Sequence, residues 1–332
     1  MDDGIILITG GAGFIGSNLV AALAERGHTD LVVVDVLGTG DKWRNIAKHE
    51  LRAVIPPEAV ADFIDANSGA ISTVFHMGAN SSTTDPDADN YVVNNLSLTL
   101  MLWEWCALHD VRFIYASSAA TYGDGAQGFE DDASPAALAR LRPLNPYGWS
   151  KHAADRRIVR LVEEGHLVPP QWAGLKFFNV YGPNEYHKGD MQSVVAKLHP
   201  TVVAGGTARL FKSHRPDYAD GGQLRDFIYV QDVVDVMLWL HETPAVNGLF
   251  NLGTGQARSF KDLAEATFRA AGREPSIEYF DMPEGLRAKY QYFTQASMAK
   301  LRAAGYPGQF TPLEEGVRRY VQDFLSAPDR YR

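Results

Sequence analysis

The sequence predicts an α/β fold in which helices cover both faces of a parallel sheet and a smaller α/β domain follows. Two patterns indicate this architecture. Short runs of consecutive apolar residues alternate with helix-like segments through the first half of the chain, and glycine, proline and polar clusters become denser after about residue 180. Strand–helix alternation is typical of parallel sheets, whose strands are buried on both faces.

Each expected strand is a short apolar run rich in Ile, Val or Phe. The expected strands are Ile5–Thr9, Leu31–Val36, Thr73–Met77, Phe113–Ala116 and Leu175–Val180. The helical segments have apolar residues at helical spacing or a proline near the first turn. The expected helices are Phe14–Gly27, Tyr91–His109, Pro146–Glu164, Gln231–Leu240, Phe260–Ala271 and Leu313–Leu325.

The length of the chain allows two domains. At about 150 residues per domain, 332 residues suit a first domain over residues 1–180 and a second over 181–332. We expect some segments of the second half to return to the first domain. No internal repeat or low-complexity tract interrupts this organisation.

Charge and cysteine content exclude several classes of protein. The chain has 31 Lys and Arg against 40 Asp and Glu, a net charge of −9, so a nucleic acid is not expected as its main partner. The single cysteine, Cys106, suits a reducing compartment. No apolar run reaches the roughly 18 residues that a membrane helix needs, and the acidic start Met1–Gly4 is unlike a signal peptide. We expect a soluble cytoplasmic protein with no membrane partner.

A glycine-rich turn follows the first expected strand. Gly10, Gly13 and Gly16 form G-x-x-G-x-x-G ahead of an amphipathic helix. Such a turn lets the backbone approach a pyrophosphate closely, and the free N–H groups of the helix N-terminus face its oxygens. This context predicts a dinucleotide-binding fold of Rossmann type for the first domain.

The acid expected to bind the adenosine ribose is Asp35. It ends the second apolar run, 19 residues after Gly16. A carboxylate alone favours NAD because it repels a 2′-phosphate, whereas Lys42 and Arg44 nearby could neutralise that phosphate. The residues leave NAD and NADP both open.

Tyr147 and Lys151 form a candidate catalytic pair. Their spacing of four places both side chains on one face of a helix. A nearby ammonium stabilises a phenolate and so lets tyrosine act as a base. Ser118 ends the fourth apolar run and is expected to share a hydrogen bond with the substrate hydroxyl that Tyr147 deprotonates. No cluster of His, Cys and Asp has metal-ligand spacing, so no metal is expected.

Together these motifs resemble the extended short-chain dehydrogenase/reductase family. The segments that carry the resemblance are Gly10–Gly16, His76–Ala79, Ser117–Ser118 and Tyr147–Lys151. A narrower resemblance runs almost end to end, to the ADP-glyceromanno-heptose 6-epimerases within that family. Ser81–Thr84 and Tyr186–Gly189 are its most particular segments.

This resemblance implies an isomerase that oxidises C-6 of ADP-D-glycero-D-manno-heptose transiently with bound NADP and returns the hydride to the opposite face. The product would serve synthesis of the lipopolysaccharide inner core. The resemblance also implies a homo-oligomer. The resemblance implies Lys188 as a second acid/base group beside Tyr147, with Lys151 and Ser118 assisting. It also implies cofactor contacts from Gly10, Gly13, Phe14, Ile15, Gly16, Asp35, Val36, Lys42, Met77, Gly78, Ala79, Asn80, Ser81, Asn94, Lys151 and Val180.

The substrate-binding residues implied by the resemblance lie mostly in the second domain. They are Ser118, Asn179, Asp190, Lys197, Phe211, Lys212, Ser213, Arg225 and Tyr290. Arg225 suits a diphosphate because a guanidinium binds two oxygens at once; the alternative is a structural ion pair with Asp226 or a neighbour.

Four departures from the family pattern concern substrate or cofactor specificity. Asp190 and Lys197 stand where the pattern has Ser and His, and Asp190 could pair with Lys188. The segment 212–224 is several residues longer than the pattern. Val36 stands where a polar residue usually follows the ribose-binding acid, which leaves NAD possible.

Other functions compete with this interpretation. A nucleotide-sugar 4,6-dehydratase needs an acid and a base near the active Ser or Thr, and Ser118–Thr121 contains no carboxylate. A UDP-hexose 4-epimerase differs mainly in the substrate pocket and stays open. A non-catalytic cofactor-binding sensor would have no need of Tyr147 and Lys151, so their presence disfavours it.

Overall fold

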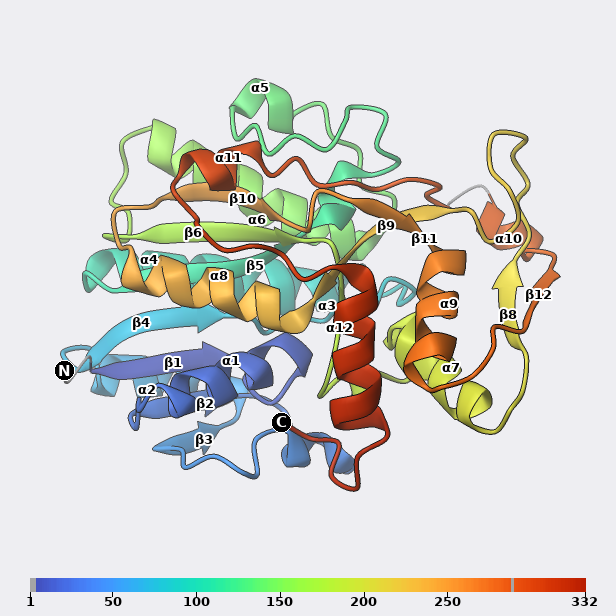
Figure 1. Ribbon diagram of the computed structural model, residues 1–332. Helices are drawn as coiled ribbons and strands as arrows, with labels where there is room; N and C mark the ends of the chain where they lie inside the picture. Colours follow the sequence, from blue (N-terminus) through green and yellow to red (C-terminus); the bar gives the residue numbers. More distant parts are fainter. Residues whose placement is uncertain (1–3, 288–289) are drawn as a thin grey trace.

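The predicted fold class is confirmed by a computed structural model, which describes residues 4–287 and 290–332 (Figure 1). At its centre is a seven-stranded parallel sheet in the order β10-β6-β5-β4-β1-β2-β3. Its strands are β1 (Ile5–Thr9), β2 (Leu31–Val34), β3 (Ala53–Ile55), β4 (Ile71–His76), β5 (Arg112–Ser118), β6 (Trp172–Phe177) and β10 (Gly248–Leu252). The strand order reverses beside β1 and β4, where ligands bind in doubly wound sheets.

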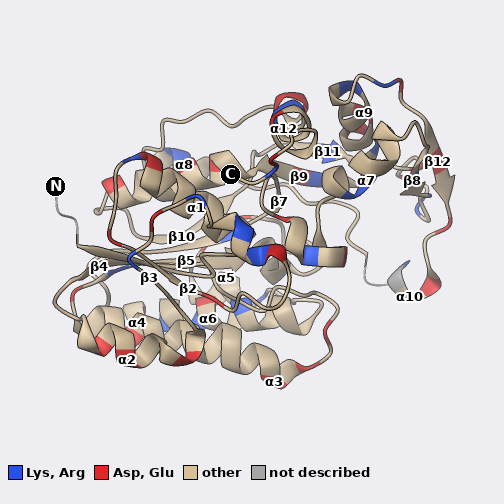
Figure 2. Ribbon diagram, turned by 90° about the horizontal axis from the view of Figure 1, so that it is seen from below, with Lys and Arg blue, Asp and Glu red and all other residues tan. Residues whose placement is uncertain are grey.

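Helices cover both faces of this sheet (Figure 2). One face carries α1 (Phe14–Glu25) and α8 (Val230–Glu242), and the other carries α2 (Val60–Ala66), α4 (Leu98–Leu108) and α6 (Pro146–Glu163). The apolar side chains of β1 alternate between the two resulting cores, with Ile6 and Ile8 in one and Ile5 and Leu7 in the other. Continuous apolar strands are thus explained by burial on both faces.

The expected helix Tyr91–His109 is longer and less regular in the structure. It begins as α3 (Ala88–Tyr91), widens into a π-helical stretch at Val92–Ser97 and continues as α4. The Asp87 carboxylate accepts hydrogen bonds from Asp89 N and Asn90 N and so caps its start. π-helical stretches inside α-helices are frequent at functional sites.

The expected strand Leu175–Val180 is two strands in different sheets. β6 ends at Phe177, and β7 (Asn179–Tyr181) pairs with β9 (Leu224–Tyr229), which also pairs with β11 (Ala257–Ser259). Phe178 stands between them and donates its N–H to Leu252 O at 3.1 Å. The chain changes sheets here, so Asn179 lies at the junction between the large sheet and the second half of the molecule.

Most of the remaining elements pack beyond one end of the large sheet (Figure 1). These are β8 (Ala208–Phe211), β12 (Ile277–Phe280), α7 (Val194–Val203), α9 (Phe260–Ala270), α10 (Glu284–Arg287) and α12 (Leu313–Arg319). Two other helices, α5 (Pro135–Leu138) and α11 (Ala299–Ala303), lie over the large sheet near α6 and β10. The chain also returns to the large sheet through α8 and β10 after residue 230.

Within the described residues, no helix has the length and apolar character needed to cross a bilayer. Residues 1–3, on which the expectation about a signal peptide partly rests, lie outside the described residues.

Candidate active site

The glycine turn between β1 and α1 requires residues without a Cβ. Gly10 has a φ of 64°, and a Cβ there would lie 2.6 Å from Gly78 Cα. A Cβ on Gly16 would lie 2.2 Å from Gly10 O, inside any permitted contact. The turn therefore folds tightly against the end of β4 and leaves the N-terminus of α1 open to an anion.

Asp35 directly follows β2 and is tied to the glycine turn. One carboxylate oxygen accepts Ala12 N at 2.9 Å, and the other accepts Val36 N at 2.7 Å and the Lys42 ammonium at 2.5 Å. Lys42 comes from the 3₁₀ turn Asp41–Asn45. The acid and the cation predicted for the ribose end of the site are therefore in direct contact, and the Asp35 charge is neutralised locally.

A cavity of about 800 Å³ opens where the glycine turn meets the carboxyl ends of β1, β2, β4, β5 and β6. All of the residues predicted to contact a cofactor line it, as do Tyr147, Lys188, Ser118 and Asn179. The strands end at the same edge of a parallel sheet, which is why residues far apart in sequence meet there. One cavity therefore brings together the residues expected for the cofactor and those expected for proton transfer.

Tyr147 lies in the first turn of α6. Asn145 caps this helix through a hydrogen bond from Gly148 N at 2.8 Å, and Pro146 occupies its first position. Burial raises the pKa of Tyr147, and a hydrogen bond with Ser118 opposes that rise. At neutral pH the Tyr147 side chain is therefore a protonated phenol and cannot accept a proton. Proton removal by Tyr147 needs a positive charge beside it that stabilises the phenolate.

Lys151 lies one turn further along α6 and is almost completely buried. Burial lowers its pKa to about 8, while the Asp155 carboxylate opposes this shift. Its ammonium has no hydrogen-bond partner among the described residues. A buried ammonium without a partner is costly, and the hydroxyl groups of a ribose would satisfy it. The site therefore fits a dinucleotide at both ends, the glycine turn and Lys151.

Lys188 enters the cavity from another element, the 3₁₀ turn Tyr186–Met191. Its ammonium lies 5.0 Å from the centre of the Phe14 ring, at the start of α1. Burial lowers the pKa of Lys188; Glu185 opposes this shift and Lys197 adds to it. A lysine with a lowered pKa exchanges protons more readily near neutral pH.

Several predicted substrate residues lie outside the lining of this cavity. They are Asp190, Lys197, Phe211, Lys212, Ser213, Arg225 and Tyr290. Asp190 forms no ion pair with Lys188 in the part of the chain that the structure describes; instead the Lys197 ammonium binds the carbonyl oxygen of Asp190. The suggested Asp190–Lys188 pair is therefore wrong for this conformation.

Arg225 belongs to a cluster of aromatic rings beside the cavity. Its guanidinium lies 5.2 Å from the centre of the Tyr290 ring and 5.7 Å from that of Phe260, and it donates to the carbonyl oxygens of Leu224 and Gln291. The Tyr290 ring also contacts Phe211. Asp226 is bonded elsewhere, to Thr254, Gly255 and Ala296, so the alternative of an Arg225–Asp226 ion pair is wrong.

Sequence reasoning missed part of the cavity wall. The missed residues include His187, Met191, Gln192, Ser193, Val194, Phe227, Phe260 and Leu263. Proximity to Lys188 in sequence was a usable signal for His187. Phe227, Phe260 and Leu263 had none, since apolar residues in a strand or helix are typical of ordinary core.

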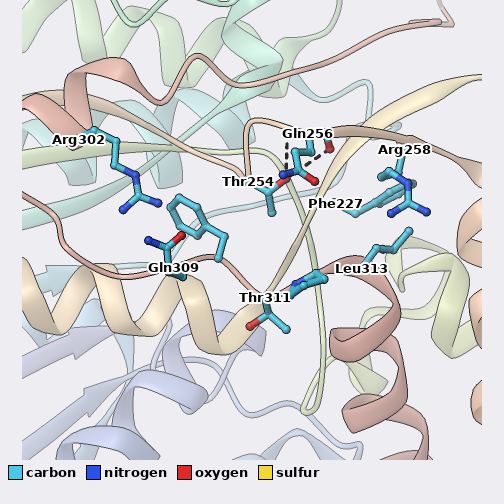
Figure 3. Close-up of a pocket in the computed structure, with 10 residues that line it drawn as sticks. Phe227, Thr254, Gln256, Arg258, Arg302, Gln309, Thr311 and Leu313 are labelled. Atoms are coloured by element: carbon cyan, nitrogen blue, oxygen red, sulfur yellow. Dashed lines mark hydrogen bonds between the residues drawn. The ribbon is translucent and has the colours of Figure 1, made fainter.

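A smaller hollow of about 190 Å³ holds none of the predicted site residues (Figure 3). Arg302 and Gln309 lie at one end of it and Arg258 at the other (Figure 3). Arg258 pairs with Asp262 and Glu314, and Arg302 donates to the carbonyl oxygens of Tyr306 and Gly308. Both arginines already have partners within the protein, so this hollow offers no binding site comparable with the larger cavity.

The chain is similar to known epimerases along nearly its whole length. Residues 6–253 match the family described as "NAD dependent epimerase/dehydratase family". The ADP-L-glycero-D-manno-heptose-6-epimerase of Nitratidesulfovibrio vulgaris (strain DP4) is 53% identical over 327 residues, covering 98% of this chain and 99% of that one. The structure of the Helicobacter pylori ADP-L-glycero-D-manno-heptose-6-epimerase matches with a TM-score of 0.77 and 27% identity, over 98% of this chain and 97% of that one. The UDP-glucose 4-epimerase of Thermus thermophilus, in complex with NAD, matches with a TM-score of 0.75 and 28% identity, over 97% and 99% of the two chains.

Proposed function

Because the chain belongs to the NAD dependent epimerase/dehydratase family and, within it, to the ADP-L-glycero-D-manno-heptose-6-epimerases, we propose that it interconverts the two C-6 epimers of ADP-glycero-D-manno-heptose. The family resemblance predicted from the motifs is thereby confirmed, and the chain is an isomerase. In a cell, this reaction supplies heptose for the lipopolysaccharide inner core.

The observation that carries the proposal is the meeting of two proton-transfer groups in one cavity with the glycine turn. Tyr147 comes from α6 and Lys188 from the Tyr186–Met191 turn. Epimerising a carbinol carbon requires oxidation and reduction, because its C–H is too weakly acidic for a base alone. Hydride leaves one face of the sugar carbon and returns to the other. An acid/base group must therefore lie near the reacting oxygen in each of the two orientations of the sugar.

The glycine turn and Lys151 would hold a nicotinamide dinucleotide, which would supply reversible hydride transfer at C-6. Tyr147 takes the hydroxyl proton as the C–H bond breaks, and the Lys151 ammonium stabilises the phenolate. Ser118 donates a hydrogen bond to the reacting oxygen. After the planar 6-keto sugar turns in the site, Lys188 gives a proton to the oxygen as hydride reaches the opposite face. The oxidation and the reduction cancel, so no cofactor is consumed. Tyr147 has gained one proton and Lys188 has lost one, so a proton must return from Tyr147 to Lys188 through solvent before the next turnover in the same direction.

We assign NADP as the preferred cofactor, with NAD as the alternative. The contact between Lys42 and Asp35 supports this choice, since the ammonium cancels the carboxylate charge that would repel a 2′-phosphate. His187 also lines the cavity. Burial lowers the pKa of His187 to about 4, so its ring is neutral at pH 7 and Lys42 supplies the positive charge beside Asp35. We also propose residues 1–180 as the cofactor-binding domain and 181–332 as mainly substrate-binding, in a homo-oligomer.

The test is to identify the nucleotide that co-purifies and then supply ADP-heptose without added cofactor. We expect bound NADP, found by absorbance and mass spectrometry, and conversion to an equilibrium mixture of epimers. Stoichiometric consumption of NADPH would replace the epimerase with a reductase. Conversion of UDP-glucose in preference to ADP-heptose would favour a UDP-hexose 4-epimerase.

A further inference from the structure

The turn that carries Lys188 is a short 3₁₀ segment, Tyr186–Met191. Hydrogen bonds from Lys188 N to Glu185 O and from Gln192 N to Gly189 O join it to its flanking residues, and Gln192 Nε2 donates to Tyr186 O at 2.7 Å. The chain enters it through Asn184, whose φ of 71° is in the left-handed region, and kinks at Gly189. Outside glycine, left-handed backbone is uncommon and is kept where surrounding contacts hold it, although asparagine adopts it more readily than most residues. Contacts from outside the turn therefore bear on its position.

Residues Asp329–Arg332, here named the strap, contact the turn directly. The Tyr186 hydroxyl donates to Arg330 O at 2.7 Å. The rings of Tyr186 and Tyr331 meet edge to face, with 5.4 Å between their centres and 88° between their planes. The Arg330 guanidinium lies 4.3 Å from the centre of the Tyr186 ring. The strap thus packs against Tyr186, two positions before Lys188.

The strap also holds the entrance to the turn. Arg332 N donates to Asn184 Oδ1 at 3.1 Å, and Asn184 Nδ2 donates to Ser17 Oγ in α1 at 3.0 Å. Asn184 is completely buried. Asn45 adds a third tie, since its side-chain amide donates to both Asn184 O and Ala12 O of the glycine turn. The left-handed residue is therefore fixed from three sides.

The strap is itself anchored on the large sheet's helices. The Arg332 guanidinium binds Gln231 in α8 at 2.5 Å and Glu25 in α1 at 2.9 Å. Lys48 binds Tyr331 O at 2.5 Å and the Asp329 carboxylate at 2.8 Å. Both whole-molecule views show the chain's last residue beside the α1 side of the sheet (Figures 1 and 2).

We propose that Tyr331 and Arg332 are positioning residues that hold the Tyr186–Met191 turn against α1, so that Lys188 stays at the cavity. Phe14 is the first residue of α1, and the contact of the Lys188 ammonium with its ring depends on the position of the turn. The proposal rests on the proposed role of Lys188. It adds that a segment more than 140 residues away in sequence sets the geometry of that group.

The test uses the full chain with Tyr331→Ala, Arg332→Gln and their double variant. The first readout is cleavage after Lys188 by a lysine-specific protease, which requires the turn to open. We expect the double variant to be cleaved there at least tenfold faster, with its cofactor content unchanged. Lys188→Met identifies the cut by abolishing it. Arg318→Gln, which removes an exposed arginine of α12 bonded to Glu315 and Gln322, is the matched control and should leave the cleavage rate unchanged.

The second readout is turnover in a double-mutant cycle. The strap variants should lower kcat about tenfold in the wild-type background and have almost no further effect in Lys188→Met, because they act through Lys188. Equal losses in both backgrounds, or unchanged cleavage after Lys188, would overturn the positioning role. Normal turnover by Lys188→Met alone would instead remove Lys188 from the proposed function, while the protease would still report whether the strap holds the turn.

Discussion

The Lys176 ammonium and the Asp155 carboxylate form an ion pair at 2.7 Å that is almost completely buried. Asp155 lies one turn after Lys151 in α6, and Lys176 lies in β6. The same carboxylate accepts hydrogen bonds from Ser117, next to Ser118, and from Tyr115. One acid therefore joins α6 and β5, which carry three of the proposed catalytic groups, to the neighbouring strand β6.

Removing one member of this pair should be strongly destabilising. Lys176→Met leaves Asp155 buried without its cation, and Asp155→Asn leaves Lys176 with Thr121 as its hydrogen-bond partner. We expect each to lower the free energy of unfolding by about 3–5 kcal/mol, measured by urea denaturation. The double variant Asp155→Asn/Lys176→Met should lose much less than the sum, because no charge is left unpaired. Additive losses would mean that the pair contributes no coupling.

The proposed acid/base roles predict two variants with the same phenotype. Tyr147→Phe removes only a hydroxyl and Lys188→Met only an ammonium, so each should slow epimer interconversion by about 10²–10⁴-fold. Both should keep their nucleotide, as measured by mass spectrometry. Tyr306→Phe changes a phenol outside the cavity lining and should leave turnover unchanged. Wild-type rates in both site variants would refute the assignment.

The preference for NADP should depend on Lys42. Lys42→Ala removes a charge-assisted contact worth about 1.5–3 kcal/mol and exposes the Asp35 carboxylate to a 2′-phosphate. We expect the Kd for NADP to rise about 10–100-fold and the Kd for NAD to change little, as measured by calorimetry on protein stripped of nucleotide. A parallel loss for both nucleotides would place Lys42 away from the 2′-position.

The dinucleotide end of the site could be predicted because its signals are local. Gly10, Gly13 and Gly16 are required by one turn, and Asp35 and Ser118 mark the ends of apolar runs. Strands of a parallel sheet deliver their ends to one edge, so these local patterns were enough to place the residues together. The bounds of β1 and the start of α6 follow the prediction for the same reason.

Features set by contacts between distant segments could not be predicted. Nothing in the apolar run around Phe178 marks the point where the chain changes sheets, because Phe177 and Phe178 are both buried and suit either strand. The rings of Phe260 and Tyr290, from two other segments, lie beside the Arg225 guanidinium, and no pattern around Arg225 indicates them. The contact of Tyr331 with Tyr186 likewise has no local signal.

Gly16 should be indispensable for nucleotide binding. In Gly16→Ala the new methyl group would lie 2.2 Å from Gly10 O, so the turn must open and the N-terminus of α1 must move. We expect protein purified without nucleotide, seen as a low ratio of absorbance at about 260 to 280 nm and by mass spectrometry. Gly40→Ala is the matched control, since a Cβ there meets nothing within 4 Å. Stoichiometric nucleotide in Gly16→Ala would contradict this role of the turn.

Acid should destabilise the protein through His76, which lies buried at the end of β4. Its ring nitrogens are 2.7 Å from Thr9 Oγ1 and 2.8 Å from Thr99 Oγ1. Burial, reinforced by Lys151, lowers the pKa of His76 to about 3. Below about pH 6.5 the unfolded chain therefore binds a proton that the folded chain does not, and stability falls by about 1.4 kcal/mol per pH unit until about pH 3.

The variant His76→Gln isolates this contribution. Between pH 6.5 and 5, wild-type protein should lose about 1.7 kcal/mol more of its free energy of unfolding than His76→Gln does, as measured by urea denaturation at each pH. His152 and His187, whose pKa values burial also lowers to about 4, remain in both proteins, so their effects cancel. His166→Gln removes an exposed histidine and should keep the wild-type slope. Equal slopes for wild type and His76→Gln would show that His76 takes up its proton in the folded state.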